Sequence, residues 1–303
     1  MDNGNEIRDF LVSRRARITP DQAGLPAYGG NRRVAGLRRE EVALLAGVSI
    51  DYYTRLERGR AAGASDAVLE GVARALHLDE AERAHLFDLA RAAAPAAPRA
   101  PRRPGPQQVR PSVRRILDSM AASPAYVRNA RCDILAANRR AAALFAPSLT
   151  APAQPANTAR FLFLDPAASE FYPDWERQAQ DVVAMLRTEA GRSPHDRALS
   201  NLIGELSTRS EHFRTWWAAH NVRFHRTGTK RFHHPVVGDL TLTFEALDLA
   251  ADSGLRISAY SAEPGTPSDD ALKLLATWAA TMDQAAPAAD GGRAHLPARQ
   301  FSA

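Results

Sequence analysis

The apolar residues of the first ninety positions recur at the three- and four-residue spacing of amphipathic helices. Ile7, Phe10 and Leu11 mark the first helix in this way. Capping residues then divide the segment, because Gly47 stands where a C-cap is expected and Ser49 can cap the helix that follows. The pattern predicts an all-α domain over residues 1–93, with helices at Glu6–Arg15, Arg38–Ala46 and Ile50–Arg58, a fourth capped by Ser65, and a fifth begun by a capping box of Asp79 and Glu82.

Residues 111–282 mix the two-residue period of strands with the period of helices. Strands are expected at Ala125–Val127, Asp133–Ala137, Lys230–His234, Leu240–Leu247 and Leu255–Ser261. Helices are expected at Arg139–Phe145, Trp175–Thr188, Arg197–Leu206 and Glu211–His220. Strands, then helices, then strands indicate an antiparallel sheet covered by helices on one face, so the expected fold class is α+β.

A last helix, Asp269–Ala280, carries an apolar stripe formed by Leu272, Leu275, Trp278 and Ala279. The pattern leaves two interpretations open. The stripe can form a dimer face, or it can pack on the sheet of its own domain.

A segment rich in proline and arginine separates the two regions. Six prolines between residues 94 and 111 prevent a continuous helix and favour an extended chain. Residues 94–115 also carry six arginines and no acidic residue. We therefore expect four parts: a helical domain over 1–93, a linker over 94–110, a mixed domain over 111–282, and a disordered tail over 283–303.

Composition limits the class of protein further. The chain has 303 residues, a formal net charge of +5 and a single cysteine, Cys132. One cysteine forms no internal disulfide and no four-cysteine zinc site. No apolar run is long enough to span a membrane, and the acidic N-terminus has no apolar signal stretch. These features predict a cytoplasmic protein.

The segment from Leu37 to Gly59 has the pattern of a helix-turn-helix. Val42, Ala43 and Leu56 lie where the two helices must be apolar, and Gly47 lies at the tight turn. The outer face of the second helix would enter a major groove, while Arg39 at the start of the first would hold a phosphate. Asp51 can accept a hydrogen bond from a cytosine amino group, whereas Glu57 is expected to pair inward with an arginine of the N-terminal helix Glu6–Arg15. The expected DNA-binding residues are Arg32 and Arg33 in the preceding loop, with Arg38, Arg39, Ser49, Ile50, Asp51, Tyr52, Arg55 and Arg58.

This segment resembles the Cro/C1-type helix-turn-helix regulators of the XRE family. More narrowly, GLRREEVALLAGVSIDYYTRLERGR (residues 36–60) resembles the MmyB-like transcription regulators of actinobacteria. The broader family usually has glutamine at the position of Arg39, so arginine there is a departure from its pattern.

The mixed domain resembles the ligand-binding domain of the same regulators, which has a PAS-like fold. The resemblance rests on DILAANRRAAALF (residues 133–145), RFLFLDP (160–166), FYPDW (171–175), GELSTRSEHFRTWWAAHNV (204–222), GTKRFHHPVVGDLTLTFE (228–245) and YSAEPGTPS (260–268). It implies that the domain binds a small, fatty-acid-like molecule.

The residues of the mixed domain also predict a pocket by themselves. Aromatic side chains gather there in a chain that is only 7% aromatic, and a few histidines and arginines accompany them, as in many ligand sites. The alternative is that the aromatic residues form an ordinary core. The candidate ligand-binding residues are Tyr172, Trp217, His220, Arg231, Phe232, His234 and Phe244.

Two other functions compete with a ligand-controlled regulator. One is an enzyme or metal-binding domain with a helical appendage, but the histidines lack the spacing of a zinc protease and no phosphate-binding loop occurs. The other is a DNA-binding protein whose middle domain serves only for dimerisation. The sequence favours a transcription regulator without enzymatic activity, metal or cofactor, which binds double-stranded DNA and a small apolar ligand, acts as a homodimer and does not enter membranes.

Overall fold

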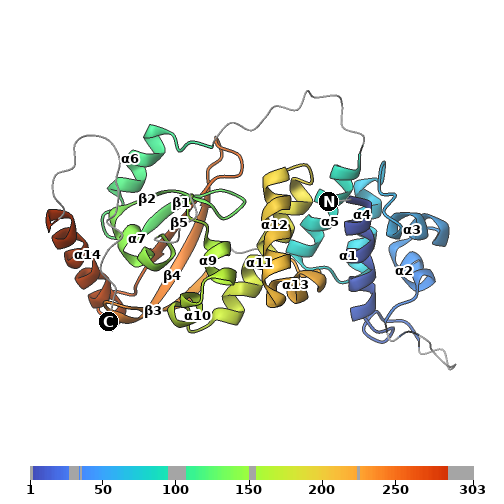
Figure 1. The fold of residues 1–303 in the computed structure, drawn as a ribbon. Helices are drawn as coiled ribbons and strands as arrows, with labels where there is room; N and C mark the ends of the chain where they lie inside the picture. Colours follow the sequence, from blue (N-terminus) through green and yellow to red (C-terminus); the bar gives the residue numbers. More distant parts are fainter. Residues whose placement is uncertain are drawn as a thin grey trace. The chain divides into compact units, whose positions relative to one another are not determined.

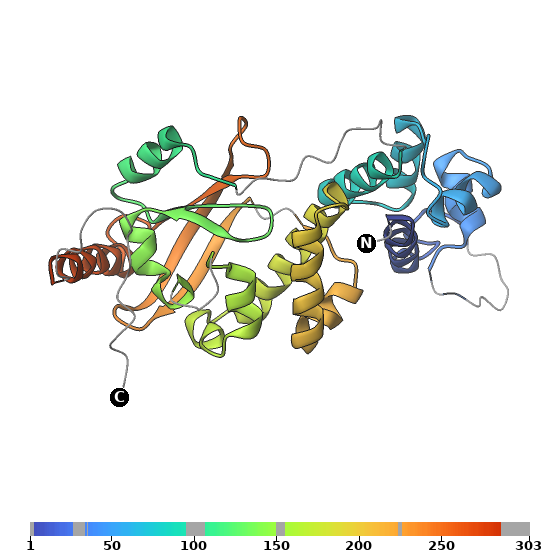
Figure 2. The same ribbon diagram turned by 45° about the horizontal axis from the view of Figure 1, so that its top comes forward.

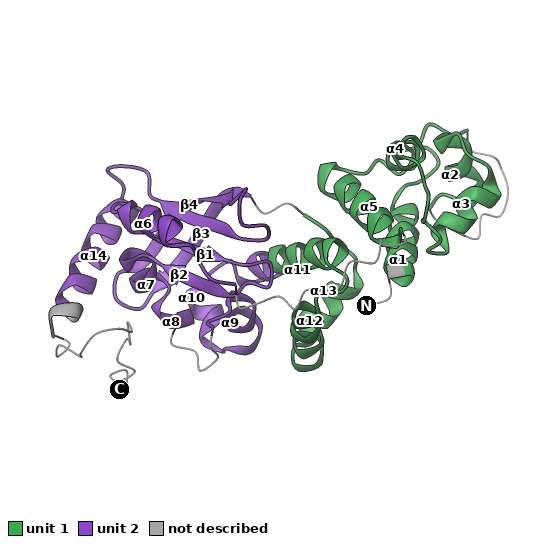
Figure 3. Ribbon diagram, turned by 90° about the horizontal axis from the view of Figure 1, so that it is seen from above, with its two compact units in different colours: residues 1–103, 180–224 green, residues 104–179, 225–303 purple. Residues whose placement is uncertain are grey.

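The computed structural model describes residues 3–26, 34, 36–94, 107–149, 155–223 and 226–285. The chain folds into two compact units (Figure 3). The first consists of residues 1–103 and 180–224, and the second of residues 104–179 and 225–303. Most of the predicted tail and of the predicted linker lies outside the described residues, but residues 283–285 of the predicted tail are the end of a helix, α14 (Pro267–Ala285), and not disordered.

The N-terminal part of the first unit contains the five helices that the sequence predicts (Figure 1). They are α1 (Asn3–Arg17), α2 (Arg39–Ala46), α3 (Ile50–Glu57), α4 (Asp66–Ala75) and α5 (Glu80–Ala93). Their apolar faces meet in one core, in which Phe10, Val42 and Leu56 are buried. The helical spacing of the apolar residues therefore reports this core correctly.

The predicted caps hold the ends of these helices. Gly47 adopts a left-handed conformation with φ of 69° after α2, which a residue with a side chain adopts only at a cost. Ser49 and Ser65 each accept a hydrogen bond from a backbone amide of the first turn of α3 and α4. Asp79 and Glu82 form the expected capping box at α5. All four cap predictions are confirmed.

Three further helices follow one another later in the chain. They are α11 (Trp175–Arg192), α12 (Arg197–Arg209) and α13 (Glu211–Ala218). The sequence pattern assigned all three to the domain at 111–282, whereas residues 180–224 fold as part of the first unit. The reason is physical: Val222 is buried in the core of the N-terminal helices, and buried ion pairs join the same elements.

The second unit is built on a five-stranded sheet whose neighbouring strands are all antiparallel (Figures 1 and 2). Its strands are β1 (Ala125–Arg128), β2 (Ile134–Ala137), β3 (Thr227–His234), β4 (Gly238–Asp248) and β5 (Arg256–Ser261), in the order β2-β1-β5-β4-β3. Its helices are α6 (Pro111–Ser119), α7 (Arg139–Leu144), α8 (Ala146–Leu149), α9 (Thr158–Leu164), α10 (Ala167–Phe171) and α14 (Pro267–Ala285). The expected α+β fold class is confirmed.

Helices cover both faces of this sheet, not one. The strand register places Phe232, Leu240 and Leu242 on the same face, which α7, α10 and α14 cover. Helix α6 covers the opposite face of β1 and β5 through Val113 and Leu117. The expectation of a single covered face is wrong because the pattern did not predict α6, whose first residue is Pro111.

The apolar stripe of α14 packs within its own unit. Leu272, Leu275 and Ala279 are buried, and α14 contacts α7 and β4. This settles the open alternative in favour of packing on the sheet. Among the described residues, no helix combines the length and the apolar character that crossing a membrane requires.

Candidate nucleic-acid interface

One side of α3 is anchored in the core and the other faces solvent. Tyr53, Leu56 and Glu57 are buried, while Ile50 on the outer side is 47% exposed. Ser49 Oγ accepts from the Tyr52 amide at 3.1 Å and so fixes the start of the helix. The structure brings the predicted α3 residues together: Ser49, Ile50, Asp51, Arg55 and Arg58 are exposed and Tyr52 is half-buried. A face of this kind can enter a major groove.

Two of these residues contact each other directly. The guanidinium of Arg55 lies over the ring of Tyr52, 4.9 Å from its centroid. Such a cation–π contact fixes two long side chains with respect to each other. Tyr52 and Arg55 are therefore presented as one preformed group.

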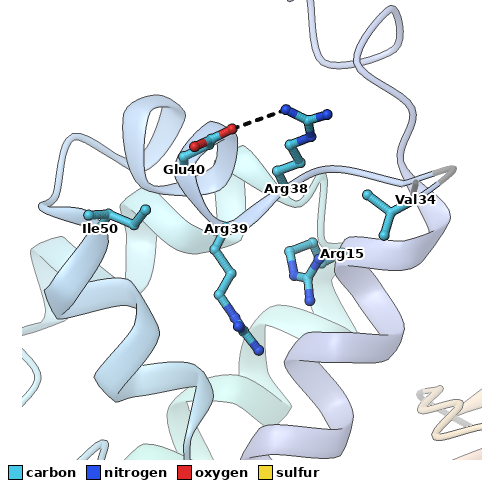
Figure 4. Close-up of a pocket in the computed structure, with 6 residues that line it drawn as sticks. All are labelled: Arg15, Val34, Arg38, Arg39, Glu40 and Ile50. Carbon is cyan, nitrogen blue, oxygen red and sulfur yellow. Dashed lines mark hydrogen bonds and ion pairs between the residues drawn. The ribbon is translucent and has the colours of Figure 1, made fainter. Parts of the chain in front are cut away.

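An open hollow of about 350 Å³ lies beside α3 (Figure 4). It collects three arginines against one glutamate at the N-terminus of α2, where the helix dipole also favours an anion. Arg38 at its edge pairs with Glu40, with 3.4 Å between Nη1 and Oε1. The lining residues are Arg15, Val34, Arg38, Arg39, Glu40 and Ile50. Arg32 and Arg33, the predicted arm, lie outside the described residues.

A buried carboxylate holds two of these arginines in place. Glu57, 1% exposed, accepts from Arg15 Nε at 2.9 Å and from Arg39 Nε at 2.7 Å. Burial alone would raise the pKa of Glu57, but the hydrogen bonds from Arg15 and Arg39 outweigh it and hold that pKa below its ordinary value. The inward pairing predicted for Glu57 is confirmed. The arginine of the N-terminal helix that pairs with Glu57 is Arg15, which the sequence did not single out among the arginines of that helix.

Comparison with protein families agrees with this geometry. The model of the MmyB-like transcription regulator ligand binding domain matches residues 109–275, which is more than half of the chain. The chain belongs to the MmyB-like transcription regulators. A helix-turn-helix domain matches residues 14–86 of the regulator and contains α2, α3 and the hollow between them. No curated protein was found to match the chain. The MmyB-like protein is thus a DNA-binding transcription regulator, and neither matched domain is that of an enzyme.

The second unit of the regulator has an aromatic cluster on the inner face of its sheet. Phe232 on β3 lies 5.6 Å from Tyr172, 5.5 Å from Phe171 and 5.8 Å from Phe145, measured between ring centroids. Phe244 on β4 reaches the cluster through Tyr260, at 6.0 Å. The structure therefore brings together Tyr172, Phe232 and Phe244 of the candidate ligand site.

His234 also contacts the cluster, 6.4 Å from the ring of Phe171. It is buried, and both ring nitrogens have partners: Nδ1 accepts from the Val236 amide at 3.2 Å, and Nε2 donates to the Ala143 carbonyl at 3.2 Å. Burial lowers the pKa of His234, although the bond to Ala143 opposes this. His234 is thus a neutral histidine that the fold itself satisfies.

The other three candidates are not part of this group. Arg231 is exposed, and its Nε donates to Asp174 at 2.7 Å. Trp217 and His220 belong to the first unit, where both contact Arg187. Sequence spacing did not reveal that Trp217 and His220 belong to the first unit, because both lie close to β3 along the chain.

One buried cation beside the cluster was not predicted. Arg128, at the end of β1, is 5% exposed and forms no ion pair or side-chain hydrogen bond with the residues described here. Burial raises the pKa of Tyr260, Tyr126 and Tyr172 raise it further, and the charge of Arg128 opposes that rise. Arg128 therefore lies close to the aromatic rings. Within the described part of the chain, no three metal-ligating side chains gather at one point.

Proposed function

We propose that the regulator reads a specific operator with the exposed face of α3, while the arginines beside α2 hold the DNA backbone. The observation that carries this proposal is the pairing of two features in one place. A preformed Tyr52–Arg55 group lies on the outer side of α3, and a hollow with three arginines lies next to it. Contacts to base edges give specificity, and phosphate contacts give position.

The test is selection of bound duplexes from a random DNA pool with the full-length protein. A specific operator is expected to emerge within a few rounds and to bind about a thousandfold tighter than random DNA. If the duplexes recovered at low salt share no enriched sequence, the protein does not recognise a specific operator.

The second unit binds a small, largely apolar, fatty-acid-like molecule in its aromatic cluster. Each buried methylene of such a chain contributes about 0.8 kcal/mol, which supplies the driving force. A carboxylate head group needs a cation to offset its lost hydration, and Arg128 is buried beside the cluster without a carboxylate partner among the described residues. The rings of the cluster now touch, so a ligand chain must separate them as it enters.

Mass spectrometry of molecules extracted from the purified protein tests the ligand, and titration of operator DNA with and without palmitate tests its effect. A bound lipid and a shifted DNA affinity are expected. If no lipid is extracted, and palmitate changes neither the melting temperature nor the DNA affinity, the ligand proposal fails. The second unit would then serve only in assembly.

The regulator acts in the cytoplasm as a homodimer on an inverted repeat. One helix-turn-helix buries little DNA surface, and two-fold pairing is how such modules reach useful affinity. The stripe on α14 is buried within its own unit, so the dimer surface lies elsewhere. A monomeric mass at micromolar concentration, with a single unrepeated operator, would contradict the dimer.

A further inference from the structure

Residues 180–224 lie inside the stretch matched by the ligand-binding domain, yet they fold with the helix-turn-helix domain (Figure 3). Val222 is buried in the same apolar core as Phe10 and Leu89. A part of the ligand-binding sequence is therefore a structural part of the DNA-binding unit. We call residues 180–224 the docking segment.

A buried arginine joins α11 of the docking segment to α1. Arg187 is 1% exposed, and its Nη1 lies 2.6 Å from Glu6 Oε2 at the start of α1. Its guanidinium also lies over the ring of Trp217, 4.0 Å from the centroid. Removing one partner of this ion pair would leave the other charge buried and uncompensated, so the docked arrangement depends on both residues.

A second buried arginine, on α1, also connects α1 to the docking segment. Arg14 of α1 donates to the backbone carbonyl of His220, and its Nε lies 2.8 Å from Glu82 Oε1 on α5. Burial lowers the pKa of Arg14 to about 10, although Glu82 opposes this. Each buried arginine thus has one carboxylate partner, and Glu82 also pairs with the exposed Arg17 at 3.2 Å.

The helices also approach more closely than a side chain permits. A Cβ atom on Gly191 of α11 would lie 2.6 Å from Cε1 and 2.8 Å from Nδ1 of His85 on α5. His85 is itself buried and packs edge-on against Phe10 at 5.1 Å. At the rim of this contact, Arg192 Nε lies 3.0 Å from Asp88 Oδ2. A side chain at position 191 would therefore have to displace the buried ring of His85.

Helix α1 connects this contact to α3. Arg14 binds the docking segment, while its neighbour Arg15 binds Glu57 at the end of α3 and the Leu37 carbonyl at 2.8 Å. Glu57 in turn holds Arg39 in the hollow. A displacement of α1 by the docking segment thus changes the support of both α3 and the arginine hollow.

The docking segment is also attached to the ligand-binding side of the chain. Helix α11 begins at Trp175 in the second unit, where Trp175 Nε1 donates to the Leu162 carbonyl on α9 at 2.8 Å. Phe161 on the same helix contacts Tyr172 of the aromatic cluster, at 6.2 Å between centroids. Helix α9 thus contacts both the aromatic cluster and the first residue of α11, the helix that carries Arg187.

We propose that the docking segment ties the ligand-binding domain to the helix-turn-helix domain and sets the conformation of α3 through α1. The route to α3 is a physical contact chain, Arg187 to Glu6 on α1, then Arg15 to Glu57. Coupling of this kind requires that the docked and undocked arrangements support α3 differently. Only the consequence for operator affinity rests on the proposed function.

Hydrogen exchange of the full-length protein, without DNA or ligand, tests the docking. Gly191→Ala forces the new methyl group against His85, and Gly204→Ala is its matched control, because a Cβ there meets nothing within 4 Å. We expect Gly191→Ala to speed exchange in α1, α3 and α5 about tenfold and Gly204→Ala to leave it within about twofold. Unchanged exchange in α3 of Gly191→Ala would overturn the proposal, even if exchange in α5 rises.

A second variant covers the case in which Gly191→Ala does not fold. Asp88→Asn removes only the carboxylate that pairs with Arg192 and Arg91, and it should produce a smaller rise in the same helices. No rise in α3 would again overturn the proposal. DNA titration with the same proteins separates the two proposals: if the wild type binds no DNA, the proposed function fails, while the exchange data still decide whether the segment docks and controls α3.

Discussion

Arg39 at the start of α2 donates through Nε to Glu57 at the end of α3, with 2.7 Å between Nε and Oε1. The bond joins the two helices of the helix-turn-helix by their side chains. It also fixes the orientation of the Arg39 guanidinium, the group that we propose to hold a phosphate. An arginine held in this way loses less conformational entropy on binding DNA than a freely moving one.

Arg39→Ala should weaken binding to all DNA sequences. The variant loses one phosphate contact, so the slope of log affinity against log salt should fall by about one. Arg91→Ala is the control, because Arg91 lies on α5 and is 74% exposed. Salt titrations of operator and random duplexes measure both variants, and a loss confined to the operator would contradict a phosphate role.

Tyr52→Ala and Arg55→Ala should relax sequence preference. Each side chain supports the other through the cation–π contact, so both variants should cost about 1–3 kcal/mol at overlapping base pairs. Competition of wild-type and single-base-substituted operators measures the change. An unchanged preference in both variants would show that α3 does not read the bases there.

Glu57→Gln should destabilise the first unit by about 1–3 kcal/mol, since two arginines lose the charge of their shared partner. Glu40→Gln provides the control, because Glu40 is 60% exposed and pairs only at the surface with Arg38. Denaturant unfolding followed by circular dichroism compares them. Equal stability of the two variants would mean that the buried pairs contribute nothing.

Arg128→Gln should reduce the affinity for palmitate about tenfold or more, because the carboxylate loses a charged partner. Arg231→Gln is the matched control, since Arg231 is exposed and already paired with Asp174. Calorimetry with palmitate and with its uncharged methyl ester separates the head group from the chain. Equal losses of palmitate affinity in both variants would show that Arg128 does not bind the carboxylate head group.

The first unit should lose stability as the pH falls from about 6.5 towards 4. Burial lowers the pKa of His85 to about 3, and the charges of Arg187, Arg14, His220 and Arg192 lower it further. Its folded-state pKa is therefore depressed, so its contribution to stability is complete above the unfolded-state value and declines as the pH drops below it. At pH 5 the loss is about 2 kcal/mol for this one group.

Unfolding of the His85→Phe variant between pH 4 and 7 tests this assignment. The phenyl ring keeps the packing and does not titrate, so the dependence on pH should be shallower than in the wild type. His77→Asn is the control, because His77 is exposed and asparagine tolerates its φ of 46°. The same slope in all three proteins would contradict the role of His85.

The sequence predicted the five N-terminal helices, the five strands and the exposure of the outer side of α3 correctly, because each depends on local spacing and capping. Helix α6 was missed although it has a recognisable signal: Pro111 at its first position, followed by Val113 and Leu117 four residues apart. The short helices α9 and α10 have too few turns to show a clear period.

The buried arginines could not have been predicted in the same way. Arg14 and Arg187 look like any other arginine in this arginine-rich chain, and their burial depends on partners such as Glu6, which lies 181 residues from Arg187. The same reason explains the misplacement of Trp217 and His220 among the ligand-binding candidates. The periodicity of apolar residues indicates which face of a helix is buried. It does not indicate which part of the chain packs against that face.

The docking segment has a consequence for how this protein can be divided or recombined. The chain passes from one unit to the other three times, at residues 103–104, 179–180 and 224–225. A gene fragment that ends in the proline-rich stretch therefore encodes only part of the first unit and lacks Gly191, which packs against His85. A chimaera that exchanges only residues 1–93 between regulators places α1 and α5 of one protein against the docking segment of the other. Exchange of a complete unit requires residues 1–103 and 180–224 to be transferred together, so that Arg14 and Arg187 keep their partners.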